Sequence, residues 1–214
     1  MTPDLVIFDC DGVLVDTEVI TNRIIADNLT GYGLPIAPDE CHTLFSGGTM
    51  QGAMADAKQR GARLPDNWLD EIYAAVFAGL SQGLRVMEDL FPLLEALDRA
   101  GIQTCIASNG PPAKMDVSLK PSGLLQYFEG RIYSGHTHGA PKPAPDMLLI
   151  ACEELGVTPD MAMMIDDSPA GLISANRAGI RAIGFDETGN PARLKAHTTE
   201  VVPDMATLQK LIFQ

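Results

Sequence analysis

Short apolar runs recur along the chain, and they have the length and composition of strands that are buried on both faces. Helical patterns lie between most of these runs and stop at glycines, as at Gly101, Gly156 and Gly179. Strands that alternate with helices in this way predict βαβ units, and therefore an α/β fold with a mainly parallel sheet and helices on both faces. The predicted strands are Leu5–Phe8, Gln103–Ala107, Arg131–Tyr133, Met161–Ile165 and Arg181–Phe185.

The stretch from about Thr17 to Ser81 interrupts this alternation. It is rich in helix formers, as in "MQGAMADAKQR" and "NWLDEIYAAVFAGL", and contains no run that predicts a strand. The simplest interpretation is a helical insertion placed directly after the first strand. We therefore predict two domains, a core of residues 1–16 and 84–214 and an all-helical domain of residues 17–83.

The first predicted strand ends in two aspartates, within the segment "VIFDCDGVLVD". Side chains at positions i and i+2 of a strand point to one face, so Asp9 and Asp11 are expected on the same side. Two carboxylates about 5 Å apart repel by roughly 3 kcal/mol at an effective dielectric constant near 20, and a bound cation is the first candidate to offset that cost. A plain hairpin is the alternative, because Asp11-Gly12 between apolar residues is a strong hairpin signal.

Polar residues also follow two later predicted strands. Ser108-Asn109-Gly110 ends one and Asp166-Asp167-Ser168 ends another, and ligands of open α/β sheets bind at the carboxyl ends of the strands. Carboxylates with phosphate oxygens suit Mg²⁺, and backbone N–H groups at the start of a helix bind anions. Lys142, between two prolines, offers a positive charge. Each group also has a simpler interpretation. Ser108-Asn109-Gly110 would be a strand-to-helix turn, Asp166-Asp167-Ser168 a helix cap, and Lys142 a solvated lysine.

Composition restricts the kinds of partner. The 214 residues carry a formal net charge of −13, which argues against nucleic acid or an anionic membrane surface. The sequence has no apolar run long enough to cross a bilayer and no recognisable signal peptide. The four cysteines are scattered without CxxC spacing. We therefore expect a cytoplasmic protein with reduced, mostly buried thiols.

The segments "DCDGV", "SN", "KP" and "DDSPAG" occur in this order along the chain. Together they resemble the four motifs of the haloacid dehalogenase superfamily, and the resemblance covers essentially the whole chain. The helical insertion resembles the type 1 cap of the β-phosphoglucomutase-like and phosphoglycolate phosphatase-like branch. Within that branch, "SNGPPAKM", "YSG" and "KPAPDML" are similar to 6-phosphogluconate phosphatase-like proteins. The resemblance implies a Rossmann-like core with an inserted helical cap.

The resemblance also implies roles for individual residues. Asp9 would be the nucleophile that forms an aspartyl-phosphate, and Asp11 would protonate the leaving oxygen and later activate water. Lys142 would neutralise charge on the nucleophile and the phosphate. The residues that the resemblance implies in phosphate binding are Ser108, Asn109, Gly110, Lys142 and Gly12. Those that it implies in Mg²⁺ binding are Asp9, Asp167, Asp11 through its backbone carbonyl and, in support, Asp166.

We therefore predict an enzyme, a Mg²⁺-dependent phosphatase that hydrolyses a small-metabolite phosphomonoester such as a sugar or sugar-acid phosphate. A phosphomutase is the nearest alternative. Mutases of this branch hold the distal phosphate with a cap arginine, and "FSGGTMQGAM" places Met50 there instead. A non-catalytic phospholigand-binding protein is a further alternative, although neither the nucleophile nor the lysine is lost. We expect no nucleic-acid or membrane partner and a monomer or weak dimer.

Overall fold

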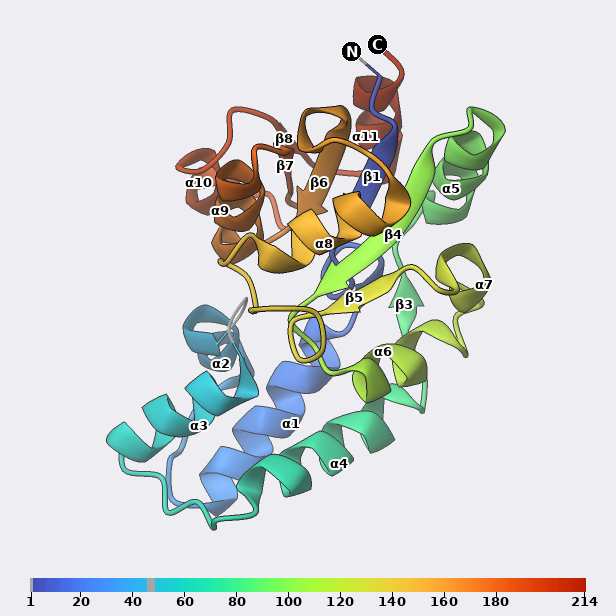
Figure 1. Cartoon of the computed structure of the whole chain (residues 1–214). Helices are drawn as coiled ribbons and strands as arrows, with labels where there is room; N and C mark the ends of the chain where they lie inside the picture. The colour runs from blue at the N-terminus through green and yellow to red at the C-terminus, as the bar shows by residue number, and fades with distance from the viewer. Residues whose placement is uncertain (1, 46–48) are drawn as a thin grey trace. The chain divides into compact units, whose positions relative to one another are not determined.

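The structure, a computed structural model, describes residues 2–45 and 49–214 (Figure 1). It divides into two compact units, which we call the core unit (Met1–Val15 with Val86–Gln214) and the helical unit (Asp16–Arg85). The chain passes from one unit to the other at two short strands, β2 (Val15–Asp16) and β3 (Arg85–Val86). These two strands pair with each other in a small separate sheet.

The core unit is built on a six-stranded sheet with the strand order β5-β4-β1-β6-β7-β8. Each pair of neighbouring strands is parallel, as the alternation of strands and helices predicts. The predicted strands are all present, with ends within a residue of those expected, whereas the two-residue β8 is too short to give a sequence pattern. The strands are β1 (Leu5–Phe8), β4 (Gln103–Ser108), β5 (Ile132–Ser134), β6 (Ala162–Asp166), β7 (Arg181–Phe185) and β8 (Val201–Val202).

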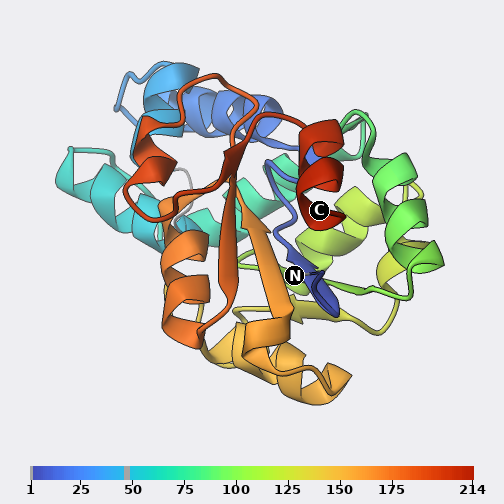
Figure 2. The same cartoon turned by 90° about the horizontal axis from the view of Figure 1, so that it is seen from above.

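Helices cover both faces of this sheet (Figure 2). Alternate residues of β1 divide between two buried clusters, Val6 and Phe8 in one and Leu5 and Ile7 in the other. The first cluster is completed by α5 (Leu90–Arg99), α6 (Pro112–Leu119), α7 (Leu125–Phe128) and α11 (Met205–Ile212). The second is completed by α8 (Asp146–Leu155), α9 (Pro169–Ala178) and α10 (Ala192–Lys195), and a 3₁₀ turn (Pro159–Met161) precedes β6. The predicted Rossmann-like α/β core is therefore confirmed.

The helical unit consists of α1 (Glu18–Gly31), α2 (Pro38–Phe45), α3 (Met50–Gln59) and α4 (Trp68–Leu80) within its described residues. A polar network joins α1 to α4. The indole N–H of the buried Trp68 donates to Asn28 Oδ1 at 2.6 Å, and Asn28 and Tyr32 donate to Glu71 at 2.9 and 2.6 Å. This network fixes how the two helices pack. None of the described helices of the chain combines the length and the apolar character that a membrane crossing requires.

The segment after β1 makes a tight turn and not a hairpin with β1. Both neighbours of β1 in the sheet, β4 and β6, run parallel to it. The chain turns over the next few residues, where the Leu14 N–H donates to the Cys10 carbonyl at 3.0 Å and the Gly12 N–H to the Val15 carbonyl at 2.9 Å. Gly12 has a φ of +79°, which glycine adopts without strain. The plain hairpin alternative is therefore wrong, although Gly12 does make a turn.

Candidate active site

The carboxyl ends of β1, β4 and β6 bring residues from three distant segments to one edge of the sheet. Phe8 at the end of β1 is in register with Ile106 of β4 and Ile165 of β6. The residue after Phe8 is Asp9, whereas β4 ends at Ser108 and β6 ends at Asp166. The three polar side chains thus begin from neighbouring strands, at the edge where open α/β sheets bind ligands.

Lys142 is the centre of a buried cluster of charges at this edge. Its Nζ atom donates to Asp9 Oδ1 at 2.8 Å, to Asp166 Oδ2 at 2.7 Å and to the Ala107 carbonyl at 3.0 Å. Asn109 holds the backbone of Lys142, because its Oδ1 accepts from the Lys142 N–H at 2.7 Å and its Nδ2 donates to the Lys142 carbonyl at 3.0 Å. Only 5% of Lys142 is exposed, so its interpretation as a solvated lysine is wrong.

Asp166 is a fixed acceptor in the same cluster. Its Oδ1 accepts from the N–H and the hydroxyl of Ser168 at 2.8 and 2.6 Å, while its Oδ2 accepts from Lys142. Ser168 also caps α9, because its hydroxyl oxygen accepts from the Gly171 N–H at 3.2 Å. A Cβ atom on Gly171 would overlap the Asp166 carboxylate. Glycine is therefore required for α9 to begin this close to the cluster.

Burial raises the pKa of Asp9 to about 7. Attraction to Lys142 opposes this rise, and repulsion from Asp166 and Asp11 adds to it. Burial also acts to lower the pKa of Lys142, but attraction to Asp166 and Asp9 outweighs burial and raises it above its usual value. A further positive charge at this edge would favour the ionised form of Asp9, which is the form a nucleophile needs.

Three carboxylates at this edge have the arrangement of metal ligands. One oxygen from each of Asp9, Asp166 and Asp167 lies within 4.8 Å of the other two. Hard cations such as Mg²⁺ prefer carboxylate oxygens and usually take one or two of them with waters and phosphate. Both oxygens of Asp166 already accept hydrogen bonds from the protein, which makes Asp9 and Asp167 the better candidates for direct ligands. The donor set therefore fits Mg²⁺.

Two residues shape the surroundings of Asp167. A Cβ atom on Gly12 would come within 2.6 Å of Asp167 Oδ2, so glycine lets the turn after β1 approach this carboxylate closely. Arg193 Nη2 lies 3.7 Å from the same oxygen. The sequence patterns single out Gly12 but not Arg193, because Arg193 lies outside every motif.

The loop after β4 joins the strand to α6 and is held by hydrogen bonds. The Ser108 hydroxyl oxygen accepts from the Gly110 N–H at 3.0 Å, and α6 begins at Pro112. Ser134 of β5 supports the loop, because its hydroxyl donates to the Gly110 carbonyl at 2.7 Å. Backbone N–H groups at the start of a helix favour phosphate, but Pro111 and Pro112 carry no N–H at the start of α6. Sequence reasoning gave Ser134 no role, although this residue lies directly after a predicted strand and within the segment "YSG".

A second lysine, Lys114, reaches this edge from the first turn of α6. Its Nζ atom lies 2.6 Å from Asp11 Oδ2, and only 15% of its side chain is exposed. Sequence reasoning missed this residue as well. Two signals were available, because Lys114 lies within the segment "SNGPPAKM" and a lysine in the first turn of a helix opposes the helix dipole, which favours an acidic partner nearby.

Comparison with known proteins agrees with this arrangement. The family model of haloacid dehalogenase-like hydrolases matches residues 3–179. The chain is 30% identical over 184 residues to the 6-phosphogluconate phosphatase of Escherichia coli (strain K12), which covers 85% of this chain and 82% of that protein. It is 31% identical over 239 residues to a β-phosphoglucomutase of Mycobacterium bovis, with coverages of 94% and 90%. A solved haloacid dehalogenase-like protein from Agrobacterium tumefaciens gives a TM-score of 0.84 at 32% identity, covering 98% of this chain and 97% of that one.

Proposed function

Because this chain belongs to the haloacid dehalogenase-like hydrolase family, we propose that it hydrolyses a small-metabolite phosphomonoester through an aspartyl-phosphate on Asp9. One observation carries the proposal. Asp9 is buried, lies 2.8 Å from the ammonium group of Lys142 and belongs to the group of three carboxylates. A buried cluster of charges with a shifted pKa at a ligand-binding edge is typical of a catalytic site.

In the first step, an oxygen of Asp9 attacks phosphorus. A bond forms between this carboxylate oxygen and phosphorus while the bond between phosphorus and the ester oxygen breaks. Asp11 gives a proton to the leaving oxygen, so the product departs as a neutral alcohol. Lys142 and the backbone N–H groups of the Ser108–Gly110 loop stabilise charge on the transferring phosphoryl oxygens.

In the second step, water attacks the phosphorus of the aspartyl-phosphate. Asp11 takes a proton from this water, and the bond between phosphorus and the Asp9 oxygen breaks. Inorganic phosphate leaves, and the Asp9 carboxylate and the Asp11 proton of the resting enzyme are restored. The net reaction consumes one phosphomonoester and one water and produces one alcohol and one phosphate.

Mg²⁺ is the cofactor that we propose for this site. Asp9, Asp167 and the backbone carbonyl of Asp11 would hold it, with Asp166 in support. Bound there, the cation supplies positive charge that lowers the pKa of Asp9 and offsets the repulsion among the carboxylates. We expect a chelator to stop turnover and added Mg²⁺ to restore it.

We propose sugar and sugar-acid phosphates as the substrate class, and residues 17–83 as the cap that the family places after its first motif. The names of the Escherichia coli and Mycobacterium bovis relatives, a 6-phosphogluconate phosphatase and a β-phosphoglucomutase, support this class. We favour hydrolysis over the mutase reaction because Met50 stands where a mutase cap carries an arginine for the second phosphate.

We further propose a cytoplasmic setting, action on a free metabolite and a monomer or weak dimer. The four cysteines are all buried free thiols, which is usual in a reducing compartment. Sedimentation at several protein concentrations tests the oligomeric state.

A panel of phosphorylated metabolites tests the proposed function. Purified protein with Mg²⁺ should release inorganic phosphate from at least one sugar or sugar-acid phosphate, and acid quench should trap a phosphoryl group on Asp9. Product analysis distinguishes the mutase, which would return an isomeric phosphate and little free phosphate. Binding without turnover across the whole panel would instead support a phospholigand-binding protein.

A further inference from the structure

Lys114 has no assigned role in the proposed mechanism, yet it contacts one of its central groups. Its ammonium group lies 2.6 Å from Asp11 Oδ2, closer than Lys142 lies to either of its carboxylate partners. The contact joins residues 103 positions apart in the sequence, so it depends on the folded core unit. It is a specific tertiary contact of the kind that sequence patterns do not reveal.

The position of Lys114 would cost free energy without this contact. Its side chain is only 15% exposed, and the removal of an ammonium group from water costs free energy. It also lies in the first turn of α6, where the helix dipole disfavours a positive charge. Burial acts to lower the pKa of Lys114, but attraction to Asp11 outweighs burial and raises it above its usual value. The contact with Asp11 is therefore what makes this position tolerable for a lysine.

The surroundings place this contact beside Ser108 and Gly110, two residues of the proposed phosphate-binding loop. A Cβ atom built on Gly110 would have Ser108 Oγ at 3.3 Å, Lys114 Cδ at 3.6 Å and Asp11 Oδ2 at 3.9 Å as its nearest neighbours. The hydroxyl of Ser108, the stem of Lys114 and the carboxylate of Asp11 thus surround the same small region. The Asp11 side chain can rotate about its χ angles, and the ammonium group of Lys114, which comes from α6, holds it in this region.

We propose that Lys114 is a positioning residue that holds the Asp11 carboxylate in place for the hydrolysis of the aspartyl-phosphate. This inference rests on the proposed function. In that step Asp11 accepts the proton of the attacking water while the bond between phosphorus and the Asp9 oxygen breaks. An ammonium group only donates hydrogen bonds, so it holds Asp11 as an acceptor, as this step requires. Without the contact, Asp11 would lose this donor and meet the attacking water in the required geometry less often.

Lys114→Met, tested with p-nitrophenyl phosphate and Mg²⁺, separates this step from the first. Since p-nitrophenolate leaves without a proton from Asp11, formation of the aspartyl-phosphate should change little, and kcat/KM should stay within about threefold of the wild type. Hydrolysis of the trapped phosphoenzyme, followed by rapid quench and intact mass spectrometry, should slow by about tenfold or more. The phosphorylated fraction at steady state should rise.

Three further variants complete the test. Lys114→Arg keeps a donor to Asp11 and should recover part of the hydrolysis rate. Lys114→Gln keeps the chain length without the charge and should behave as Lys114→Met does, which protects the test if one variant folds poorly. Lys120→Met removes an exposed lysine that directly follows α6 and pairs with Asp116 of that helix, and this variant should match the wild type.

The outcomes separate this inference from the proposed function. If the wild type forms no phosphoenzyme and releases no phosphate from p-nitrophenyl phosphate or from any metabolite of the panel, the proposed function itself fails. If the wild type is active and Lys114→Met hydrolyses its phosphoenzyme at the wild-type rate, only the role of Lys114 is overturned. A loss of kcat/KM as large as the loss of kcat would also overturn it, because the lysine would then act in substrate binding or in the first step.

Discussion

The two ends of the sheet in the core unit carry charged groups in opposite environments. At the carboxyl end, the side chains of Asp9, Lys142 and Asp166 are 12%, 3% and 0% exposed. At the amino end, Arg181 at the start of β7 pairs with Glu200, and 35% and 33% of these two side chains are exposed. Buried charges cost free energy that their mutual attraction only partly recovers, whereas an exposed pair contributes little in either direction. The cost is concentrated at the end where the proposed chemistry needs it.

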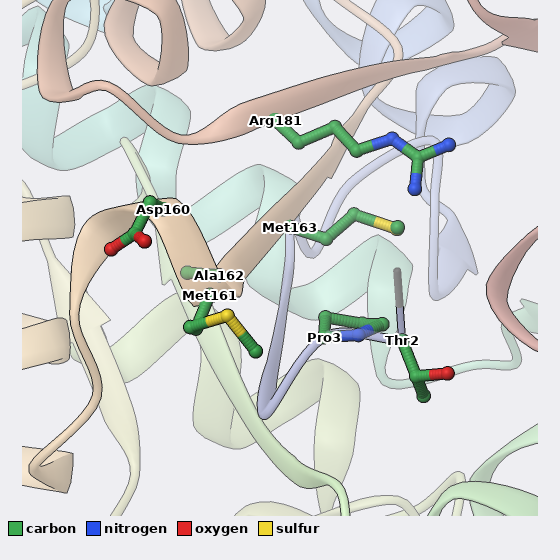
Figure 3. A pocket seen from close by; sticks show the side chains of 7 residues that line it. All are labelled: Thr2, Pro3, Asp160, Met161, Ala162, Met163 and Arg181. Carbon is green, nitrogen blue, oxygen red and sulfur yellow. The ribbon is translucent and has the colours of Figure 1, made fainter.

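A cavity is present at the amino end, although the described residues there form no cluster of metal ligands. A pocket of about 260 Å³ opens beside the starts of β1, β6 and β7 (Figure 3). Within the described part of the chain, the one group of carboxylates placed to hold a metal ion lies at the carboxyl end. The pocket lining mixes apolar and charged side chains, namely Thr2, Pro3, Asp160, Met161, Ala162, Met163 and Arg181. The buried cluster of charges at the carboxyl end is therefore a better indicator of the candidate site than the pocket at the amino end.

The largest expected effect is on turnover, from Asp9→Asn. An amide is a far weaker nucleophile than a carboxylate, so the rate of phosphate release should fall on the order of 10³-fold or more. Steady-state assays on the best metabolite of the panel measure this change. Arg181→Met at the amino end is the matched control and should retain wild-type turnover. Full activity in Asp9→Asn would place the chemistry elsewhere.

Lys142→Met should affect both activity and stability. Removal of the ammonium group leaves two buried carboxylates facing each other, and breaking a buried pair in this way typically costs about 3–5 kcal/mol. Urea unfolding without divalent metal should show this loss, together with at least a hundredfold loss of turnover with Mg²⁺. A stability change as small as that of Lys120→Met would show that the two carboxylates do not depend on the ammonium group for their burial.

The difference between the two ends also explains what the sequence predicted. Strands buried on both faces, such as Leu5–Phe8, read as continuous apolar runs, and parallel pairing brings their polar ends together, so Asp9 and Asp166 were expected at one edge. For Lys142, which the motifs assign to the site, the sequence alone does not determine the environment of the side chain. Lys142 lies between prolines, where a lysine is usually solvated, and only the structure shows that it is buried.

Contacts between segments set the other limit of the sequence analysis. The partners in the pairs Lys114–Asp11 and Arg193–Asp167 lie in different segments of the chain. Lys114 falls within the segment "SNGPPAKM", but that pattern does not identify Asp11 as its partner, and Arg193 belongs to no motif. Strand β8 has two residues, too few for a period of alternation. The sequence therefore predicted the strands and the polar residues that follow them, but not the side-chain pairs between segments without a shared pattern.

Asp9→Asn should also change how stability depends on pH when no divalent metal is present. The pKa of Asp9 is raised from 3.8 to about 7 in the folded protein. The folded state therefore binds the proton more tightly than the unfolded state does. As pH rises between the two pKa values, the free energy of unfolding of the wild type should fall by up to about 4 kcal/mol. Asp9→Asn lacks this titration, so its stability relative to the wild type should rise through the same window in denaturant titrations with a chelator. Parallel curves for the two proteins would contradict the burial of an ionisable Asp9.

Gly171→Ala should have a smaller effect. Its Cβ would overlap the Asp166 carboxylate, so α9 must shift or Asp166 must rotate, and such overpacking typically costs about 1–3 kcal/mol. Gly31→Ala, at the end of α1, is the control, because a Cβ there meets nothing within 4 Å. Chemical denaturation should show a lower free energy of unfolding for Gly171→Ala, and an unchanged or slightly higher one for Gly31→Ala.

The smallest expected effect is at the amino end, in the pair of Arg181 and Glu200. A double-mutant cycle with Arg181→Met and Glu200→Gln should give a coupling free energy below about 1 kcal/mol. The hydrogen bond from Arg181 lowers the pKa of Glu200. A carboxyl group whose pKa is lowered by folding stabilises the folded state at pH values above its unfolded pKa. This stability is lost as pH falls through the pKa of the folded state, whereas the contribution of Asp9 is lost as pH rises. The coupling should therefore be present at neutral pH, disappear as acid protonates Glu200 and weaken in about 1 M salt. A coupling as large as the loss in Lys142→Met would mean that exposure does not distinguish the two ends, because solvent screening should keep the exposed pair far weaker than the buried cluster.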